Sequence, residues 1–354
     1  MARTLGDIKT PQVNLMTLKR VMSSVVKENI FQGIVFRPEE AVTEKYSTDV
    51  NAAQIQIIRV KPHDIAAREL GADVNGGWFN SDDAAVATTE AYGIDILKSV
   101  DRNIDIPTVA QDMVNTDVAA AELENLAGLV NREINGATLA AQLATNFNAE
   151  YENTVDNWCT ITAGAEDYKT ALLTAGTHLD SGNEAQGIDF YPIEKRAIIL
   201  RPQACADLLA KGILTIGGAN KGYDILEKGT VSADATRNDA IGYRGEFSGM
   251  PVYVASPSIW SKAEKYLGLN AGALAKVYGL VVSSVGTGRA LAFAESIKTI
   301  DSPSGQGIRL QPKYRFGVEC WDAKSVVPIV ASDFANPVVS NETKLSVVAP
   351  ESRG

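Results

Sequence analysis

The sequence predicts an α+β fold, and three stretches of the chain carry that prediction. Residues 115–152 are rich in Ala and Leu, with apolar residues that recur at helical spacing. Residues 290–330 are almost entirely strand-like, apart from a turn at residues 302–307. Between them, short buried-strand and helical patterns follow one another, as at residues 196–211.

The composition is that of an acidic globular protein. The 354 residues include 33 Lys and Arg against 43 Asp and Glu, a formal net charge of −10, and 45% are hydrophobic. This length allows about two domains of roughly 150 residues, or one elaborated domain. No stretch approaches the ~18–20 apolar residues that span a bilayer, and the first residues lack a signal-peptide core, so a membrane or secreted protein is disfavoured. The acidic balance disfavours a protein that coats nucleic acid, although not one that encloses it.

Few residues are candidates for catalysis. The histidines are His63, in a predicted turn, and His178, near a predicted helix C-terminus, and neither has a recognisable partner motif. Cys159, Cys205 and Cys320 are far apart and form no CxxC pair, so we expect three reduced, buried thiols. No glycine-rich stretch has phosphate-binding or nucleophile-elbow spacing. The sequence therefore predicts no catalytic, metal or cofactor site, and we expect no enzyme.

Residues 1–37 form a basic opening segment with a local charge of +4, because six Lys and Arg oppose only Asp7 and Glu28. An apolar stripe that includes Val13, Met16 and Val25 predicts a helix near residues 12–29, too apolar to stay alone in water. Two interpretations stay open. The helix packs on its own domain, or the segment is an arm that packs on a neighbour or lines an interior. We expect its basic side chains to face the interior or a neighbour, among them Lys9, Lys19, Arg20 and Lys27.

A long hairpin is predicted next, with strands at residues 53–60 and 91–100. The connection at residues 61–90 is rich in turn residues, and a loop of this length inside a compact domain is usually functional. Trp78 and Phe79 lie among those turn residues, where no local core is predicted. We expect both aromatic side chains to be buried against a neighbouring subunit.

The central elements follow from capping and periodicity. A helix is predicted over residues 115–152, beginning near Thr116, and Gly136 and the Asn residues are expected to bend or divide it. Residues 167–178 predict a second helix and residues 196–200 a buried strand. Pro202 is well suited to the first turn of a short helix that ends near Lys211. Two further strands are expected at residues 250–254 and 277–284.

The last part of the chain predicts a long hairpin formed by residues 290–300 and 308–330. The residues that we expect to form its wall are Phe293, Ile297, Tyr314, Phe316, Val318, Cys320 and Val326.

Three motifs, in this order, resemble the major capsid proteins of tailed double-stranded DNA bacteriophages, which have the Hong Kong-97-type fold. RAIILRP at residues 196–202 resembles that family's step of Arg, an apolar run, Pro and a helix. GEFSGMPVYVAS at residues 245–256 resembles its G-x-x-x-G-x-P-V-Y strand. KYRFGVECWDAK at residues 313–324, followed by apolar residues and Pro328, is similar to its closing strands. The resemblance covers roughly residues 1–335.

The resemblance implies a division of the chain into six parts. These are an N-terminal arm (1–38), an extended loop (39–105), a peripheral domain with a long spine helix (106–195), an axial domain (196–288), a closing long hairpin returning to the peripheral domain (289–335) and a C-terminal tail (336–354).

The resemblance also implies a function without catalysis. Such subunits assemble with themselves into pentamers and hexamers of a virion shell in the host cytoplasm, and the shell encloses double-stranded DNA without sequence-specific binding. A scaffolding protein, a portal and a cement or decoration protein are further implied partners, with no membrane and no cofactor. Two alternatives stay open: an encapsulin-like compartment that holds a protein cargo, and an acidic soluble enzyme or binding domain.

Overall fold

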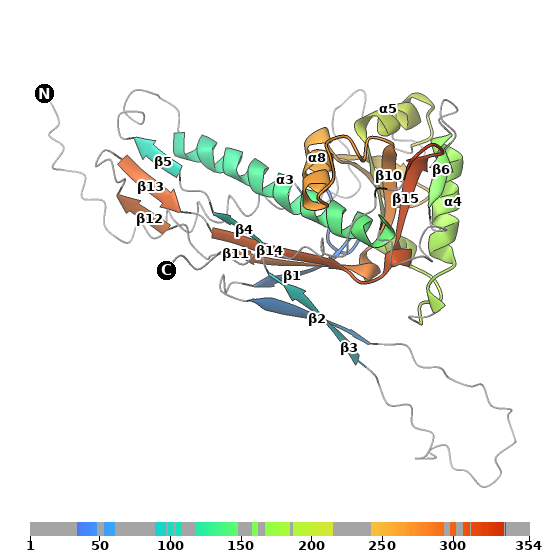
Figure 1. Ribbon diagram of the computed structural model, residues 1–354, viewed down its shortest axis with the longest axis horizontal. Helices are drawn as coiled ribbons and strands as arrows, with labels where there is room; N and C mark the ends of the chain where they lie inside the picture. Colours follow the sequence, from blue (N-terminus) through green and yellow to red (C-terminus); the bar gives the residue numbers. More distant parts are fainter. Residues whose placement is uncertain are drawn as a thin grey trace, which may run out of the picture.

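The structure is a computed structural model, in which four sheets and the helices around them make up the part that is described (Figure 1). The described residues are 34–47, 53–60, 89–96, 98–101, 104–107, 118–147, 158–161, 167–184, 187–214, 242–293, 298–301, 307–311, 313–335 and 337.

The largest sheet has six strands in the order β6-β15-β10-β7-β9-β8. It is mixed, because β7 pairs with β9 and β15 with β6 in parallel, while the other pairs are antiparallel. Its strands are β6 (Cys159–Ile161), β7 (Arg196–Leu200), β8 (Tyr243–Phe247), β9 (Met250–Val254), β10 (Val277–Ser283) and β15 (Val326–Ala331).

Helices cover both faces of this sheet. The long α3 (Val118–Phe147) and α8 (Pro257–Tyr266) pack on one face, and α4 (Tyr168–Asp180) and α5 (Pro202–Ala210) pack on the other. Strand β7 shows the consequence: Ala197 and Ile199 join the core with α3, whereas Ile198 and Leu200 join the core with α4. A strand buried on both faces is apolar at consecutive positions, which explains the AIIL run.

Two chain segments run side by side from this sheet into a second one. Strand β10 continues through the 3-10 turn Ser284–Gly286 into β11 (Thr287–Phe293), and β14 (Lys313–Cys320) continues through the turn Ala323–Ser325 into β15. The second sheet has the order β1-β11-β14-β4, with β1 (Thr43–Ser47) and β4 (Lys98–Asp101) at its edges. The antiparallel pairs β10–β15 and β11–β14 therefore join the two sheets into one framework.

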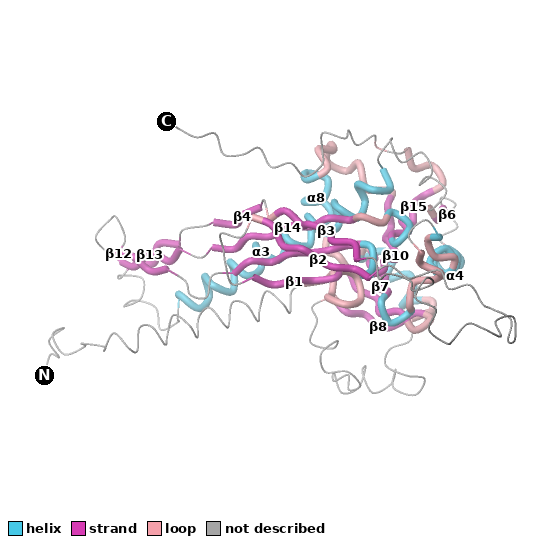
Figure 2. The backbone as a smooth tube through the Cα atoms, turned by 90° about the horizontal axis from the view of Figure 1, so that it is seen from below, coloured by secondary structure: helices cyan, strands magenta, loops and turns pink. Residues whose placement is uncertain are grey.

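Two smaller sheets complete the fold. A hairpin pairs β2 (Gln54–Val60) with β3 (Thr89–Asp95), and a three-stranded sheet holds β12 (Lys298–Asp301), β13 (Gly307–Gln311) and β5 (Ile104–Pro107). Figure 2 shows β14, β1 and the hairpin running along the same direction, with the six-stranded sheet at one end and β12–β13 at the other.

Most predicted elements are confirmed, with shifted ends. The hairpin of residues 53–60 is present, but its return strand is divided: β3 ends at Asp95, and β4 pairs with β14 instead. The closing hairpin is likewise divided, because residues 326–331 leave it and pair with β10 in the six-stranded sheet. Of its predicted wall residues, Tyr314, Phe316 and Val326 are buried. The six-part division of the chain stays a prediction.

One expectation about a helix was wrong, and one helix was not predicted. Residues Val118–Phe147 form one continuous helix of 30 residues, which Gly136 and the Asn side chains do not divide. No element was predicted at Pro257–Tyr266, where α8 buries Ile259, Trp260 and Ala263 at helical spacing. Helix α8 crosses α3 at Gly136, where a Cβ would lie 2.5 Å from the Cβ of Lys262.

Two glycines of α3 provide a paired test of this crossing. Gly136→Ala should destabilise the subunit by about 1–3 kcal/mol, because the added methyl forces α8 away. Gly128→Ala is the matched control, since a Cβ there meets nothing within 4 Å. It should stabilise the subunit by about 0.5–1 kcal/mol through helix propensity. Urea unfolding of the dissociated subunit measures both, and effects of equal sign would contradict the close helix crossing.

Candidate assembly platform

We define the assembly platform as residues 34–47 together with the base of the β2–β3 hairpin. Its chain neighbours are residues 1–33 and 61–88, where the sequence predicts the basic arm and the aromatic loop. Both segments lie outside the described residues. So do all the side chains predicted to make contacts, whose roles stay predictions: Trp78, Phe79, Lys9, Lys19, Arg20 and Lys27.

Helix α3 binds the backbone at the start of the platform. Val35 N donates to Asn135 Oδ1 at 3.0 Å, and Gln142 Nε2 donates to the Ala41 carbonyl oxygen at 3.1 Å. Both side chains are buried, where an amide is costly unless it is hydrogen-bonded. The polar residues of this helix therefore hold a second segment of the chain. Residues 35–41 run alongside α3 in the direction of its C-terminus.

The tight turn after residue 38 is bound to the crossing between the two large sheets. Ser284 Oγ donates to the Glu39 carbonyl oxygen, and Thr43 Oγ1 donates to the Ser284 carbonyl oxygen, each at 2.8 Å. Tyr253 on β9 donates its hydroxyl hydrogen to Glu40 Oε2 at 2.7 Å. Glu39 has a positive φ of 68°, a conformation that its surroundings must stabilise. These bonds fix the turn against both sheets.

A buried ion pair anchors strand β1 to β11. Glu44 and Arg289 lie opposite each other in the parallel pairing, and the Arg289 guanidinium contacts Glu44 Oε2. Their side chains are 1% and 0% exposed, so the pair is shielded from water. Burial raises the pKa of Glu44 above its ordinary value, against the opposing attraction of Arg289 and Arg37. A pair of this kind makes the register of β1 costly to change.

The hairpin base packs on the opposite face of the same sheet. Ile57, Ile94 and Ile96 form a buried cluster with Ala290 and Ala292 of β11. Two glycines leave room for this contact. A Cβ on Gly317 would lie 2.1 Å from the Asp95 carbonyl oxygen, and one on Gly288 would lie 2.4 Å from the Trp321 ring. The hairpin base can approach the sheet closely because these positions have no side chain.

Asp322 fixes the place where the β10–β11 and β14–β15 segments pass from one large sheet to the other. Its Oδ1 accepts from Asn183 Nδ2 at 2.9 Å and from Lys324 N at 3.1 Å, and its Oδ2 accepts from the Tyr191 hydroxyl at 2.5 Å. Ser325 packs against Gly286 of the facing turn, where a Cβ would lie 1.9 Å from Ser325 Oγ. The platform therefore rests on a framework whose crossing point is closely packed and hydrogen-bonded.

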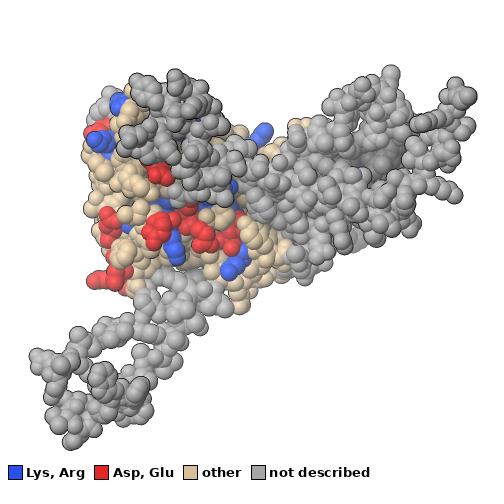
Figure 3. All heavy atoms as spheres, turned by 180° about the vertical axis from the view of Figure 1, so that it is seen from behind, with Lys and Arg blue, Asp and Glu red and all other residues tan. Residues whose placement is uncertain are grey.

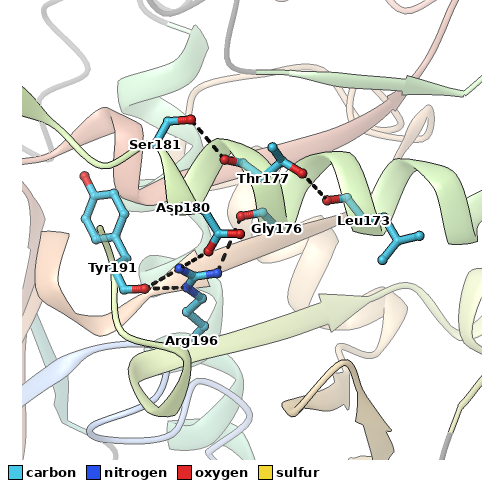
Figure 4. A network of polar contacts seen from close by, with 7 residues as sticks. All are labelled: Leu173, Gly176, Thr177, Asp180, Ser181, Tyr191 and Arg196. Atoms are coloured by element: carbon cyan, nitrogen blue, oxygen red, sulfur yellow. Dashed lines mark hydrogen bonds and ion pairs between the residues drawn. The ribbon is translucent and has the colours of Figure 1, made fainter. Parts of the chain in front are cut away.

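Arg196, the first residue of the RAIILRP motif, has a structural role (Figure 4). Its Nε donates to the Tyr191 carbonyl oxygen at 2.8 Å, and its Nη2 lies 2.7 Å from Asp180 Oδ1. Nη2 also donates to the Tyr191 carbonyl oxygen, and a longer bond from Nη1 reaches the Gly176 carbonyl oxygen of α4. The buried guanidinium thus joins α4, the following loop and β7. A cation near the C-terminus of a helix is also favoured by the helix dipole.

Arg201, later in the same motif, joins β7 to α8 and the chain before β10. Its guanidinium stacks over the Trp260 ring, with its Cζ 4.0 Å from the ring centroid. Its Nε and Nη2 donate to the carbonyl oxygens of Val277 and Leu274, at 2.6 and 2.7 Å. Pro202 then begins α5, as predicted. The motif is therefore explained by packing rather than by chemistry at a site.

The cysteines are free thiols, as predicted, with Cys159 and Cys205 buried and Cys320 partly buried. Burial raises the pKa of all three, that of Cys159 to about 11.

We therefore expect slow labelling of the native thiols by N-ethylmaleimide at pH 8. Only about a thousandth of Cys159 would be thiolate at that pH, against about a quarter of a free thiol. Mass spectrometry should show native labelling at least about a hundredfold slower than labelling in urea. Equal rates in the two conditions would show that these thiols are exposed.

The described surface carries mixed charge. Figure 3 shows Asp and Glu side chains gathered in the middle of one face, with Lys and Arg scattered among and around them. Within the described ranges, no group of three His, Cys, Asp or Glu side chains could hold a metal ion. None of the helices described here is long and apolar enough to cross a membrane. His178 lies in the last turn of α4, as predicted.

Comparison with known proteins identifies the fold. No family model matches the sequence, and no curated protein matches it. Among solved structures, the chain is similar to the capsid of Ralstonia phage GP4, with a TM-score of 0.53 and 9% identity over 87% of this chain and 91% of that one. The chain has the Hong Kong-97-type capsid fold. The predicted α+β class and fold type are thereby confirmed.

Two other solved structures with similarity have TM-scores below 0.5, and the assignment of the Hong Kong-97-type fold does not rest on them. The capsid of Helicobacter pylori bacteriophage KHP30 gives 0.49 at 12% identity, covering 94% of this chain and 99% of that one. The virus-like particle from Pyrococcus furiosus gives 0.45 at 10% identity, covering 88% and 99%.

Proposed function

We propose that the chain is a major capsid protein that assembles with itself into pentamers and hexamers of an icosahedral-type shell enclosing double-stranded DNA. The observation that carries this proposal is the fold shared with the capsid of Ralstonia phage GP4. The assembly platform adds support, because it joins the start of the chain after a basic segment and the base of a long hairpin to the same framework. Segments joined to a fixed base are suited to contacts with neighbouring subunits.

The proposed role is structural and without catalysis. The chain would reside in the virion after assembly in the host cytoplasm. A scaffolding protein, a portal and a cement or decoration protein are the proposed partners besides the chain itself. DNA would be enclosed rather than bound by sequence, which agrees with a net charge of −10. An encapsulin-like compartment with a protein cargo, and an acidic soluble enzyme, are the competing functions.

The contents of purified particles distinguish the two kinds of shell. Particles from producing cells are treated with nuclease, and their nucleic acid and protein are then extracted. A capsid is expected to protect double-stranded DNA of uniform length. Particles that hold a second protein and no DNA would contradict the proposal in favour of a cargo compartment.

The aromatic pair of the loop tests the proposed subunit contact. Trp78→Ala combined with Phe79→Ala should leave the subunit folded and impair assembly, since burying one large aromatic stabilises a contact by roughly 1.5–3 kcal/mol. Sedimentation measures particle yield, and circular dichroism measures folding. Leu173→Ala is the control, because Leu173 is an apolar residue on α4 that is already 48% exposed. A normal yield from the double variant would refute the predicted contact.

A further inference from the structure

A run of buried polar side chains lies between α3 and the strand pair β1–β11. Gln142 and Asn146 are one helical turn apart on α3, and Thr287 and Arg289 are two residues apart on β11. Glu44 of β1 lies opposite Arg289 and forms the buried ion pair with it. All five side chains are buried, and we call these residues the polar seam.

Strand alternation brings the two sides of the seam together. Gly288 and Ala290 of β11 meet the hairpin base on one face of the sheet. Thr287 and Arg289 therefore lie on the other face, because successive strand residues point to opposite sides. Gln142 Nε2 of α3 lies 3.5 Å from Thr287 Oγ1, so that face is the one that α3 covers. Arg289 follows on the same face, about 7 Å further along the strand.

Four atoms of the seam are buried and make no hydrogen bond within the described structure: Glu44 Oε1, Gln142 Oε1, Asn146 Oδ1 and Arg289 Nη1. The other polar atoms of these side chains are occupied. Glu44 binds Arg289 through Oε2, and Gln142 Nε2 donates to the Ala41 carbonyl oxygen. Asn146 Nδ2 donates to the Gln142 carbonyl oxygen at 3.3 Å. A buried polar atom without a partner is costly, and native proteins satisfy nearly all such atoms with protein groups or ordered water.

The character of these four atoms indicates which ligand they suit. Arg289 Nη1 can only donate a hydrogen bond, whereas the three oxygens can only accept one. A bound anion would meet the Glu44 carboxylate, and a bound metal cation would meet the Arg289 guanidinium. Water carries no charge and both donates and accepts, so it satisfies both kinds of atom.

We propose that the polar seam binds water molecules that are cut off from the bulk solvent. One water would accept a hydrogen bond from Arg289 Nη1, and others would donate to Glu44 Oε1 and to the amide oxygens of Gln142 and Asn146. These waters would join α3 to the β1–β11 pair. The inference goes beyond the proposed function and does not depend on it, because the whole seam belongs to one subunit.

A structure of the full-length protein at about 2 Å resolution or better tests the inference, either in particles or as crystals of the subunit. We expect ordered water peaks about 2.7–3.2 Å from Arg289 Nη1, Glu44 Oε1 and Gln142 Oε1. The apolar core around Ile199 and Leu280 is the control within the same map and should hold no water.

The same map can also contradict the inference. A well-resolved seam without water would overturn it, whether its side chains pair with one another or stay apart. A metal or halide ion in the seam, identified by its anomalous signal, would overturn it as well.

A double variant shows which side chains hold the waters. Glu44→Leu combined with Arg289→Met should remove the peaks beside positions 44 and 289 and keep the peak at Gln142 Oε1. Asp333→Ala is the control, because this carboxylate is exposed and pairs with Lys276 outside the seam, and it should leave every peak in place. Peaks that persist beside positions 44 and 289 in the double variant would contradict the inference. The wild-type map decides the question even if the double variant does not fold.

Discussion

Glu44→Ala is expected to destabilise the subunit by about 3–5 kcal/mol, the usual cost of leaving one partner of a buried ion pair uncompensated. Arg289 would then keep its charge in a position with no exposure to water. Because Glu44 holds β1 to β11, the variant should also lose the fixed position of residues 34–47. Urea unfolding of the dissociated subunit measures the stability, and sedimentation measures particle yield.

Two further variants control for this effect. Glu44→Leu combined with Arg289→Met removes both charges and should recover most of the lost stability, because apolar residues often replace buried pairs at little cost. Asp333→Ala removes a carboxylate whose partner Lys276 is also exposed, and should change stability little. Glu44→Leu and Arg289→Met are also measured singly. If the loss of stability in the double variant equalled the sum of the two single losses, the two side chains would act independently.

Gly317→Ala is expected to give the second large effect, a loss of assembly with the six-stranded sheet intact. The added Cβ would lie 2.1 Å from the Asp95 carbonyl oxygen, so the hairpin base must move from the sheet. Overpacking of this kind costs about 1–3 kcal/mol, which a folded subunit can tolerate. Assembly should fail because β2 and β3 lead directly into residues 61–88, the predicted subunit contact. Sedimentation measures the particles, and far-ultraviolet circular dichroism measures whether the subunit stays folded.

Gly128→Ala is the control for Gly317→Ala, because it adds the same methyl group at an open position of α3. It should leave the particle yield unchanged. Normal particles from Gly317→Ala would mean that assembly does not depend on the position of the hairpin base.

The elements that local pattern determines were predictable from the sequence. The RAIIL strand, the helix that Pro202 begins and the helix capped by Asp167 each have their signal within a few residues, and the structure has them within one or two positions. Helix α8 was missed although Pro257, Ile259, Trp260 and Ala263 carry the same kind of signal.

The assembly platform was not predictable in this way. Asn135 binds a backbone group 100 residues earlier in the chain, and Glu44 pairs with Arg289 across 245 residues. In the sequence, the polar residues of α3 resemble breaks in a helix, because their partners are set by the tertiary fold. The same holds for Gly288 and Gly317, whose need for space appears only when the hairpin lies against them. What the sequence did predict were the segments on either side of the platform, a basic apolar arm and an aromatic loop.

The central claim is that this chain is a shell subunit, and negative-stain electron microscopy of the purified full-length protein tests it most directly. We expect closed, uniform, rounded particles built from many copies of the 354-residue chain. A preparation that contains only small particles of one or a few subunits, at concentrations and salt conditions where the subunit is folded, would contradict that claim.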